Sequence, residues 1–444
     1  MKRLLLLIFL LTQIIVGSGQ TIIQGIINSN TTLTMDKSPY LVTGDLVLFP
    51  NWKLTIEPGV ELRFEDNIKL QIRGTLKALG TEANPISFIS NTGTTMGLWQ
   101  GIEILNTLGG NASFDYCQFS HASMAIREQC CHGGRDEIRN SRFTFNKVAI
   151  GGYTGEATAA LVENCYFANN QVCITDADKI INNCTFENNE YGLGSEPGGW
   201  WGTERVSVSN STFTNHSQIA IYGGGGGANS KLINCIITNN NIGVRSSHEG
   251  FIIDNCDISN NQVGLELSAY YNGSSWYIAP VTNSTICNNA QYNVKNNSIL
   301  DVNLYTICWC NSDSATVENL IYDAYDDIWV GFVNYTLFSE DCSQAIFKTH
   351  KAEGYTEYLS VPYLTNNETI IYPNPASSSI FIKNAEKINS ISIYDHTGKL
   401  LMDKIGFGND QIELNVSEFL PGLYIVRLAM QNNKIEFKKV IIAR

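Results

Sequence analysis

The chain has 444 residues, of which 42 are Asp or Glu and 29 are Lys or Arg, so the formal net charge is −13. This charge argues against nucleic acid and anionic membrane surfaces as partners. The length allows one large domain and a small one, and the low share of charged residues, 16%, is expected where strands are short and turns are many.

The chain begins with a pattern typical of a secretory signal. Met1-Lys2-Arg3 precedes an almost wholly apolar run from Leu4 to Val16 and then the small residues Gly17-Ser18-Gly19. We therefore expect residues 1–19 to be a signal peptide that is cleaved near Gly19. The run is too short to span a bilayer and no other stretch is long enough, so we expect no transmembrane segment in the mature chain.

Residues 20–112 contain short runs in which apolar and polar residues alternate, as in strands with one buried face. Examples are Leu54-Thr55-Ile56, Leu62-Arg63-Phe64, Leu70-Gln71-Ile72 and Ile102-Glu103-Ile104. They precede a more regular repeat, so we expect them to form the N-terminal cap and the first coils of the same structure.

From residue 113 the chain repeats an Asn, then a Cys or Ser, and two residues later a large apolar residue. With the Cys or Ser taken as position zero, the eight copies are anchored at residues 117, 141, 165, 184, 211, 235, 256 and 284. A period of about two dozen residues indicates a solenoid, in which each copy forms one coil.

Three further positions are apolar and are predicted to be interior columns. Position minus three holds Phe114, Ile138, Val162, Ile181, Val208, Leu232, Ile253 and Val281. Position plus two holds Phe119, Phe143, Phe167, Phe186, Phe213, Ile237, Ile258 and Ile286. Position plus nine, in seven copies, holds Ile126, Ile150, Ile174, Leu193, Ala220, Val244 and Leu265.

The residue before position zero is predicted to make a sharp bend. Side chains alternate along a strand, so positions zero and plus two can share one inward face, whereas position minus three can join them only after a turn. Asn, which tolerates left-handed backbone, occupies this place in seven copies. Stacked amides can also bond from coil to coil. These residues are Asn140, Asn164, Asn183, Asn210, Asn234, Asn255 and Asn283.

Five of the twelve cysteines fall in the position-zero column and are interpreted as small buried side chains. They are Cys117, Cys165, Cys184, Cys235 and Cys256. A bridge between adjacent coils, such as Cys165 to Cys184, remains open because the strand spacing of about 4.8 Å suits a disulfide. Export also favours bridges among Cys130, Cys131, Cys308, Cys310 and Cys342. We predict no metal site, since Cys308 and Cys310 lack a second pair of ligands at suitable spacing.

The repeat lacks the Leu frame and helical return of a leucine-rich repeat. Stacked Asn at such a bend instead resembles the right-handed parallel β-helix of the pectate-lyase-like superfamily, and the resemblance implies the handedness. The phrases Leu54-Thr-Ile-Glu-Pro-Gly-Val60 and Gly80-Thr-Glu-Ala-Asn-Pro-Ile86 resemble the opening coils of exported bacterial β-helix proteins. Ile321-Tyr-Asp-Ala-Tyr-Asp-Asp327, with Gly331-Phe-Val-Asn-Tyr335, resembles their closing segment, so residues 113–348 should hold the repeats and a C-terminal cap. Asp326 and Asp327 are expected to order this cap rather than to bind calcium or to catalyse.

Residues 369–444 form a second, compact all-β unit, and residues 349–368 are its linker. Its motifs are Tyr372-Pro-Asn-Pro375, Ile393-Tyr-Asp-His-Thr-Gly398 and Pro421-Gly-Leu-Tyr-Ile-Val-Arg-Leu428. In this order they resemble the type A sorting domain of the type IX secretion system of Bacteroidota. The resemblance implies the secretion machinery as a partner, passage across the outer membrane, removal of the domain in the linker, and release or attachment to surface lipopolysaccharide.

Long variable segments follow the plus-nine column, at residues 127–136, 151–160, 194–205, 222–230 and 268–279. Insertions on one side are where solenoids usually bind. Their aromatic residues are not needed for the core and would suit stacking on sugar rings, although they could instead fold down over the flank. These residues are Tyr153, Trp200, Trp201, Tyr222, Tyr270, Tyr271 and Trp276.

An enzymatic alternative would need an acid/base cluster. A lyase requires a base and a cation near the uronic carboxylate, and a hydrolase requires flanking carboxylates. Candidates that could assemble on one side are Asp176, Asp178, Glu196, Arg245 and His248. No cofactor is expected, except calcium if the chain is a lyase, and the polygalacturonase signature is not found within the repeats.

The sequence therefore predicts an all-β protein, a right-handed parallel β-helix solenoid followed by a small C-terminal β-sandwich. We expect an extracellular or cell-surface protein that binds polysaccharide through aromatic loops and has no identifiable catalytic site. A polysaccharide lyase or glycoside hydrolase, or a structural surface adhesin, remains the alternative.

Overall fold

The computed structural model describes residues 19–129, 136–152, 160–175, 179–194, 206–223, 230–246, 250–268, 270–271, 276–335, 342, 369–373, 376–383, 385, 387–395, 399–405, 411–431 and 435–443. Their regular secondary structure is nearly all strand, and they belong to two compact units, a solenoid up to Asn334 together with Cys342, and a smaller C-terminal unit. Apart from Gly19, the predicted signal peptide lies outside the described residues.

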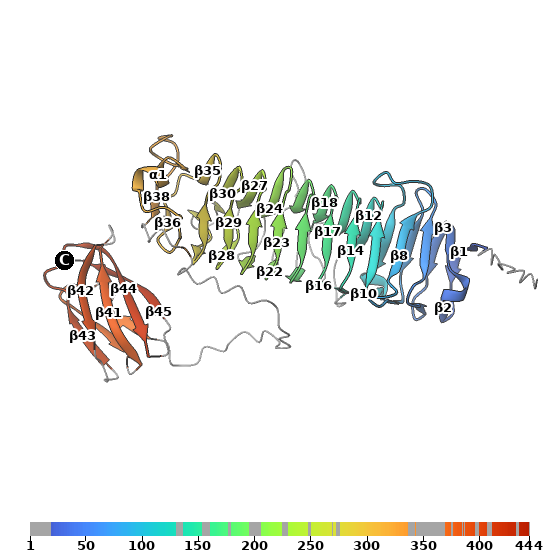
Figure 1. The fold of residues 1–444 in the computed structure, drawn as a ribbon. Coiled ribbons are helices and arrows are strands. Elements are labelled where there is room, and N and C mark those ends of the chain that lie inside the picture. Colours follow the sequence, from blue (N-terminus) through green and yellow to red (C-terminus); the bar gives the residue numbers. More distant parts are fainter. Residues whose placement is uncertain are drawn as a thin grey trace, which may run out of the picture. The chain divides into compact units, whose positions relative to one another are not determined.

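Each coil of the solenoid contributes three short strands. In one coil these are β16 (Ala160–Glu163), β17 (Tyr166–Ala168) and β18 (Val172–Ile174). Every strand pairs in parallel with its counterparts in the coils before and after, so that Phe167 lies opposite both Phe143 and Phe186. Figure 1 shows these coils stacked in chain order. The predicted parallel β-solenoid is confirmed.

The strands form three stacks, named here after the columns that they carry. The minus-three stack is β2 (Thr31–Leu33), β4 (Lys53–Ile56), β7 (Thr75–Leu79), β10 (Asn111–Asp115), β13 (Glu137–Arg139), β16, β19 (Lys179–Asn182), β22 (Ser207–Ser209), β25 (Lys231–Ile233), β28 (Ile252–Asp254) and β33 (Val281–Thr282). The plus-two stack is β5 (Glu61–Phe64), β8 (Ile86–Ser90), β11 (Cys117–Ser120), β14 (Arg142–Thr144), β17, β20 (Thr185–Glu187), β23 (Thr212–Thr214), β26 (Ile236–Thr238), β29 (Asp257–Ser259) and β34 (Thr285–Cys287). The plus-nine stack is β6 (Lys69–Ile72), β9 (Gly101–Leu105), β12 (Met124–Gln129), β15 (Val148–Gly152), β18, β21 (Tyr191–Leu193), β24 (Ile219–Gly223), β27 (Ile242–Ser246), β30 (Val263–Leu267), β35 (Tyr292–Asn296) and β37 (Ile321–Tyr322).

At the N-terminal end, β3 (Tyr40–Leu48) contributes to both the plus-two and the plus-nine stacks, and β1 (Thr21–Ile27) pairs in parallel with it. Two 3₁₀ turns, η1 (Met35–Lys37) and η2 (Asn106–Leu108), lie between strands of the first coils. The alternating runs in the sequence of this region are therefore coils of the same solenoid.

The predicted interior columns are buried. Val162, Phe167 and Ile174 each have 0% of their surface exposed. The plus-two phenylalanines stack face to face, with ring centroids 4.9 Å apart for Phe143 and Phe167 and 4.7 Å apart for Phe167 and Phe186. Parallel strands repeat at about 4.8 Å, so one ring per coil fills the column without a gap.

One residue of the plus-nine column was assigned wrongly. Leu193 and Val244 pair with Ile221, and Ala220 lies one position earlier. The bend before β24 holds one residue more than its neighbours, with Ser217 and Gln218 preceding Ile219 where Gln171 alone precedes Val172. In this coil, the residue found nine positions after the Cys or Ser therefore lies one position before the inward residue.

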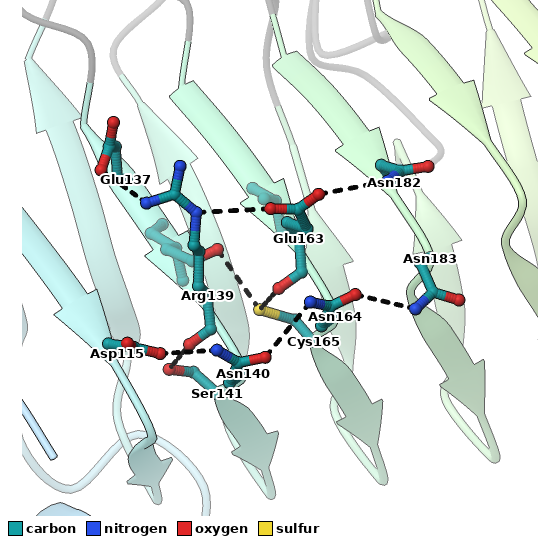
Figure 2. Close-up of polar contacts among 12 residues, drawn as sticks. Asp115, Glu137, Arg139, Asn140, Ser141, Glu163, Asn164, Cys165, Asn182 and Asn183 are labelled. Atoms are coloured by element: carbon teal, nitrogen blue, oxygen red, sulfur yellow. Dashed lines mark hydrogen bonds and ion pairs between the residues drawn. The ribbon is translucent and has the colours of Figure 1, made fainter. Parts of the chain in front are cut away.

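The first bend of each coil, before position zero, is built by Asn as predicted. All seven predicted residues have left-handed backbone, with φ between 47° and 56°. The amide of Asn183 donates to Asn164 (2.7 Å), and that of Asn164 donates to Asn140 (3.2 Å), as Figure 2 shows. The ladder is irregular at two points, where Asn210 donates to Asn182 rather than to Asn183 and Asn283 donates to Asp254 rather than to Asn255.

A second bend, between the plus-two and plus-nine stacks, contains a buried ladder that sequence reasoning missed. There a left-handed residue such as Asn169 or Asn239 precedes a buried polar one. The buried row is Asn146, Asn170, Asn189, His216, Asn240, Asn261 and Asn289. Within it Asn170 donates to Asn189 (3.1 Å) and to the carbonyl of Phe143 (2.9 Å). The doublets Asn169-Asn170 and Asn188-Asn189 were the signal in the sequence.

The cysteines of the position-zero column are free thiols and are buried, which confirms the interpretation as core side chains. Cys165 and Cys184 are not bridged, and the backbone N–H of Cys165 donates to the sulfur of Cys184 (3.4 Å). Cys173 is a further buried free thiol. Cys130 and Cys131 lie outside the described residues.

The solenoid closes in a cap that holds the two disulfides of the described residues, Cys287–Cys310 and Cys308–Cys342. The cap contains α1 (Ser314–Glu318), β36 (Val302–Leu304) and β38 (Val333–Tyr335). Asp323, Asp326 and Asp327 accept backbone N–H groups of the cap, in agreement with their predicted ordering role.

The C-terminal unit contains two small antiparallel sheets around a separate apolar core that includes Ile380, Ile391, Leu414 and Val426. One sheet is β39 (Ile370–Tyr372), β40 (Ser379–Lys383) and β43 (Gln411–Asn415). The other is β42 (Leu400–Ile405), β41 (Ile388–Tyr394), β44 (Gly422–Met430) and β45 (Ile435–Ile442).

Candidate functional site

The five long segments leave the solenoid at one corner, between the plus-nine and minus-three stacks. They connect β12 to β13, β15 to β16, β21 to β22, β24 to β25 and β30 to β33. Since these strands are in register from coil to coil, the points of departure lie one above another. We call this place the loop corner. Between Tyr270 and Tyr277 the last segment forms a short hairpin of β31 (Tyr270–Tyr271) and β32 (Trp276–Tyr277).

Of the predicted aromatic residues, Tyr222 alone has a side chain among those that the structure describes. Tyr222 lies at the end of β24 and is half-buried. It covers Gly194 of the coil below, where a Cβ would approach its backbone oxygen to 2.5 Å. The backbone of Tyr271 pairs with that of Trp276 in the hairpin, but the side chains of Tyr270, Tyr271 and Trp276 lie outside the described residues, as do Tyr153, Trp200 and Trp201.

Next to the loop corner, one residue per coil points outward from the plus-nine stack, because it follows the inward plus-nine residue. We call these residues the outer row: Glu103, Arg127, Gly151, Thr175, Gly194, Tyr222, Arg245, Glu266, Lys295 and Tyr322. The residues in the middle of the row, Gly151, Thr175 and Gly194, have small side chains, whereas most of those toward both ends are aromatic or charged. The row lies beside the corner at which the variable segments leave the solenoid.

The charges of the outer row are held by neighbours in the row or on the adjacent strand β6. Arg245 pairs through Nε with Glu266. Lys295 lies over the ring of Tyr322, with its Nζ 5.5 Å from the ring centroid. Glu103 accepts from Lys69 (2.9 Å) and from Gln71 (2.9 Å). Burial acts to raise the pKa of Glu103, but these hydrogen bonds and the positive charges lower it below its ordinary value.

Of the predicted acid/base cluster, only Arg245 is among the described residues, and it is paired with Glu266. Asp176, Asp178, Glu196 and His248 lie outside them. Sequence reasoning missed Glu266 and Lys295 of the outer row, although both follow the plus-nine column at the same offset as Arg245. Counting one position beyond that column finds Glu266, whereas it gives Val294 rather than Lys295 in the last copy, whose bend is one residue longer.

A buried charge cluster lies inside the loop corner. The Nζ of Lys179 is 2.5 Å from Oε2 of Glu128, and both side chains are almost wholly buried. Asp136, also buried, accepts from the backbone N–H of Ala112 (2.7 Å) and the amide of Asn106 (3.2 Å). Burial raises the pKa values of Glu128 and Asp136 above their ordinary range, although the charge of Lys179 opposes it.

Small residues make room for this ion pair. Lys179 is separated from Glu128 by the coil that holds Gly152 and Ala160, which lie in register with Glu128 and Lys179 respectively. Glu128 Oε1 and Asn106 Oδ1 have no hydrogen-bond partner among the described residues. Lys179 and Glu128 are therefore a specific feature of this corner that the repeat does not explain.

The sulfurs of Cys308, Cys310 and Cys342 lie within 4.8 Å of one another in the cap. They belong to the two disulfides described above, and a sulfur in a disulfide has no thiolate to offer a metal. Among the helices of the described part of the chain, none is long and apolar enough to cross a membrane.

Comparison with known families matches the two units separately. Residues 80–226 match the family described as right handed beta helix region, and residues 370–443 match the secretion system C-terminal sorting domain. The chain is thus a right-handed β-helix with a type IX sorting tail, which implies the type IX secretion machinery as partner and export to the cell surface or secretion.

Among curated proteins, the protein bark beetle of Drosophila melanogaster is 36% identical over 62 residues, which is 14% of this chain and 2% of that protein. The chain thus spans a very small part of that relative. Among solved structures, a periplasmic alginate epimerase is 12% identical, with a TM-score of 0.36 and coverage of 71% of this chain and 78% of the other. A tailspike of Acinetobacter baumannii bacteriophage Fri1, described as a capsular polysaccharide depolymerase, is 11% identical, with a TM-score of 0.37 and coverage of 88% and 73%.

Proposed function

We propose that this exported β-helix protein binds polysaccharide along the outer row and the loop corner, without cleaving it. The observation that carries the proposal is the succession of Tyr222, Arg245 and Glu266 on adjacent strands, in register and next to the variable segments. A sugar offers an apolar face to a ring and hydroxyl groups to charged side chains, so this succession supplies both kinds of contact.

The geometry favours binding because the polar groups are already held in place. Arg245 retains 24% of its side-chain exposure while it pairs with Glu266. Tyr222 rests on Gly194 and packs against a small apolar cluster of the buried residues Ile219, Ile242 and Val263. A preorganised surface loses less conformational entropy on binding than a mobile one does. The proposal includes the aromatic residues of the neighbouring segments as further sugar contacts.

A glycan array with the full chain, followed by affinity electrophoresis on the retained polymers, tests this proposal. We expect Tyr222→Ala to weaken retention roughly 2- to 10-fold, the range of a lost aromatic contact. Tyr166→Ala is the matched control, because Tyr166 is also half-exposed on a strand but belongs to the plus-two stack. Its ring likewise lies beside an arginine, with the guanidinium carbon of Arg142 4.1 Å from the ring centroid. Equal retention of both variants and the parent chain would contradict the proposal.

The enzymatic alternative is separated by an activity assay on the same polymers. A growing ultraviolet absorbance from an unsaturated product on a uronic polymer would identify a lyase, and new reducing ends on any polymer would identify a hydrolase. Either outcome would overturn the non-catalytic part of the proposal. A protein retained on no glycan and active on none would instead favour a structural adhesin.

The sorting tail makes an independent prediction about export. Deletion of residues 369–444 removes the domain that the secretion machinery recognises, whereas the solenoid keeps its own core. We expect the truncated protein to remain in the periplasm of a host that has a type IX system. Its appearance on the cell surface or in the medium, with the signal peptide intact, would refute the sorting role.

A further inference from the structure

The two disulfides of the closing cap lie against each other. The sulfur of Cys342, which is bonded to Cys308, is 3.3 Å from the sulfur of Cys310, which is bonded to Cys287. The sulfurs of Cys308, Cys310 and Cys342 all fall within 4.8 Å of one another. Reacting atoms that are well placed for attack are about 3–3.5 Å apart, so two sulfurs of different bridges stand at the separation from which a new bond can form.

The four cysteines differ in their access to solvent. Cys287 and Cys308 are buried, with 2% and 3% of their surface exposed, whereas Cys310 and Cys342 are half-buried. Each bridge therefore joins one buried and one accessible cysteine, and the two accessible sulfurs are the ones in contact. Because thiol–disulfide exchange depends on access to the attacked sulfur, an external thiol reaches Cys310 or Cys342 before it reaches their partners.

The buried cysteines are held at the last strand of the plus-two stack. Cys287 ends β34, and Cys308 lies beside this strand, where its carbonyl accepts from the backbone N–H of Ile286 (3.0 Å). Cys310 follows two residues later with left-handed backbone, at φ of 55°. The bridge from Cys287 to Cys310 is thus a covalent tie between a regular strand of the solenoid and the cap.

We propose that these cysteines form a thiol-reactive site, at which an external dithiol replaces both bridges by a single new one, Cys310–Cys342. One route begins with reduction of Cys308–Cys342. The thiolate of Cys342 then attacks the sulfur of Cys310, and the thiolate of Cys287 leaves. The other route begins with reduction of Cys287–Cys310, after which Cys310 attacks Cys342 and Cys308 leaves. Both routes give the same product, because the contact joins the two accessible sulfurs.

The exchange balances as a two-electron reduction. The dithiol loses two electrons and two protons and becomes a disulfide, and the protein gains them as the thiols of Cys287 and Cys308. The product keeps residue 342 bridged to the cap, but it no longer ties the cap to β34. A reductant would thus release the cap from the last regular coil. This site is independent of the proposed polysaccharide binding.

Limited reduction of the folded full chain with substoichiometric dithiothreitol tests the proposal. The protein is then quenched in acid, denatured, alkylated with N-ethylmaleimide and digested with chymotrypsin, which cuts after Trp309 and so separates Cys308 from Cys310. Mass spectrometry of the unreduced peptides should find Cys310 joined to Cys342, with Cys287 and Cys308 alkylated. A partly reduced protein that keeps either original bridge, or loss of both bridges without this intermediate, would overturn the proposal.

Single serine variants make the same test without a reductant. Cys287→Ser leaves Cys310 as a thiol beside the other bridge, and Cys308→Ser leaves Cys342 as one. We expect the Cys310–Cys342 bridge in both variants. Cys342→Ser is the control, in which Cys287–Cys310 should persist. A Cys287→Ser variant that keeps Cys308–Cys342, with Cys310 alkylated, would contradict the exchange.

Release of the cap has a separate readout in the double variant Cys287→Ser/Cys308→Ser, which can form only the new bridge. Hydrogen exchange should become faster than in the parent chain in β34 and in the cap strand β36, and it should stay unchanged in β17, in a coil far from the cap. Unchanged exchange in β34 and β36 would show that the bridge from Cys287 does not hold the cap.

Discussion

The bends of each coil and the loop corner handle polar groups in different ways. At the bends, Asn side chains bond to one another from coil to coil, and at the second bend they also bond to the backbone. At the loop corner, Lys179 and Glu128 form a buried ion pair that spans two coils and has no counterpart in the repeat. A repeated contact spreads stability along the solenoid, whereas a single ion pair concentrates it in one place.

The largest effect is expected at the loop corner, from Lys179→Met. Removing the ammonium leaves the carboxylate of Glu128 buried without its partner, which costs about 3–5 kcal/mol of the free energy of unfolding. The double variant Lys179→Met/Glu128→Leu removes both charges and should recover most of this loss. Urea denaturation of the two variants measures the difference. Identical midpoints for the single and the double variant would show that the pair is not the stabilising element of this corner.

Asn240→Ala tests the repeated solution at the second bend and should cost nearly as much, about 3–4 kcal/mol. The side chain of Asn240 donates to the carbonyl of Phe213 (3.2 Å) and to Asn261 (2.9 Å), and it accepts from the N–H of His216 (2.9 Å). Ala leaves the carbonyl of Phe213 and the N–H of His216 without this partner, while Asn261 still accepts from the backbone N–H of residue 240 (2.9 Å). The exposed neighbour Asn241 provides the control, since Asn241→Ala should change the free energy of unfolding by less than about 0.5 kcal/mol.

This contrast also explains what could be predicted from the sequence. The columns at Val162 and Phe167 follow from a period, because every coil repeats the same burial. A single extra residue before Ile219 was enough to misplace Ala220, since the period gives no length for an individual bend. The second ladder is visible in the sequence as paired Asn residues, although only the bend before position zero was predicted.

The buried polar residues of the loop corner had no such repeated signal in the sequence. Lys179 and Glu128 are 51 residues apart in the sequence, and their contact depends on the small residues Gly152 and Ala160 in the coil between them. The disulfide from Cys287 to Cys310 was missed for the same reason, because it joins the last regular coil to an irregular cap. Contacts that occur once require the three-dimensional path of the chain.

His216 gives the repeated ladder a pH dependence that its Asn neighbours lack. Burial lowers the pKa of His216 to about 4, from 6.5, despite hydrogen bonds that act to raise it. Between these values the unfolded chain binds the proton and the folded chain does not, so stability is complete above pH 6.5 and falls as the pH drops toward 4. The loss at pH 4 amounts to about 3 kcal/mol.

His216→Asn restores the residue that the other coils use and should remove this part of the pH dependence. The measurement is the free energy of unfolding in urea at pH 7, 5.5 and 4.5, for the parent chain and the variant. The two curves are expected to converge at low pH or to cross, because only the parent chain loses the contribution of a neutral histidine. Parallel curves would mean that His216 is protonated in the folded chain.

The smallest effect is expected at the first bend, where the Asn ladder lies at the surface. Asn164 is exposed and has left-handed backbone with φ of 54°, and its amide bonds only to Asn140, which is half-buried, and to Asn183, which is exposed. Asn164→Ala should cost about 1–2 kcal/mol, the strain of Ala in this conformation. Asn164→Gly should cost only about 0.5 kcal/mol, because Gly adopts it freely. If the two variants lose the same amount, the ladder rather than the backbone conformation stabilises this bend, and the contrast with the buried ladder at Asn240 disappears.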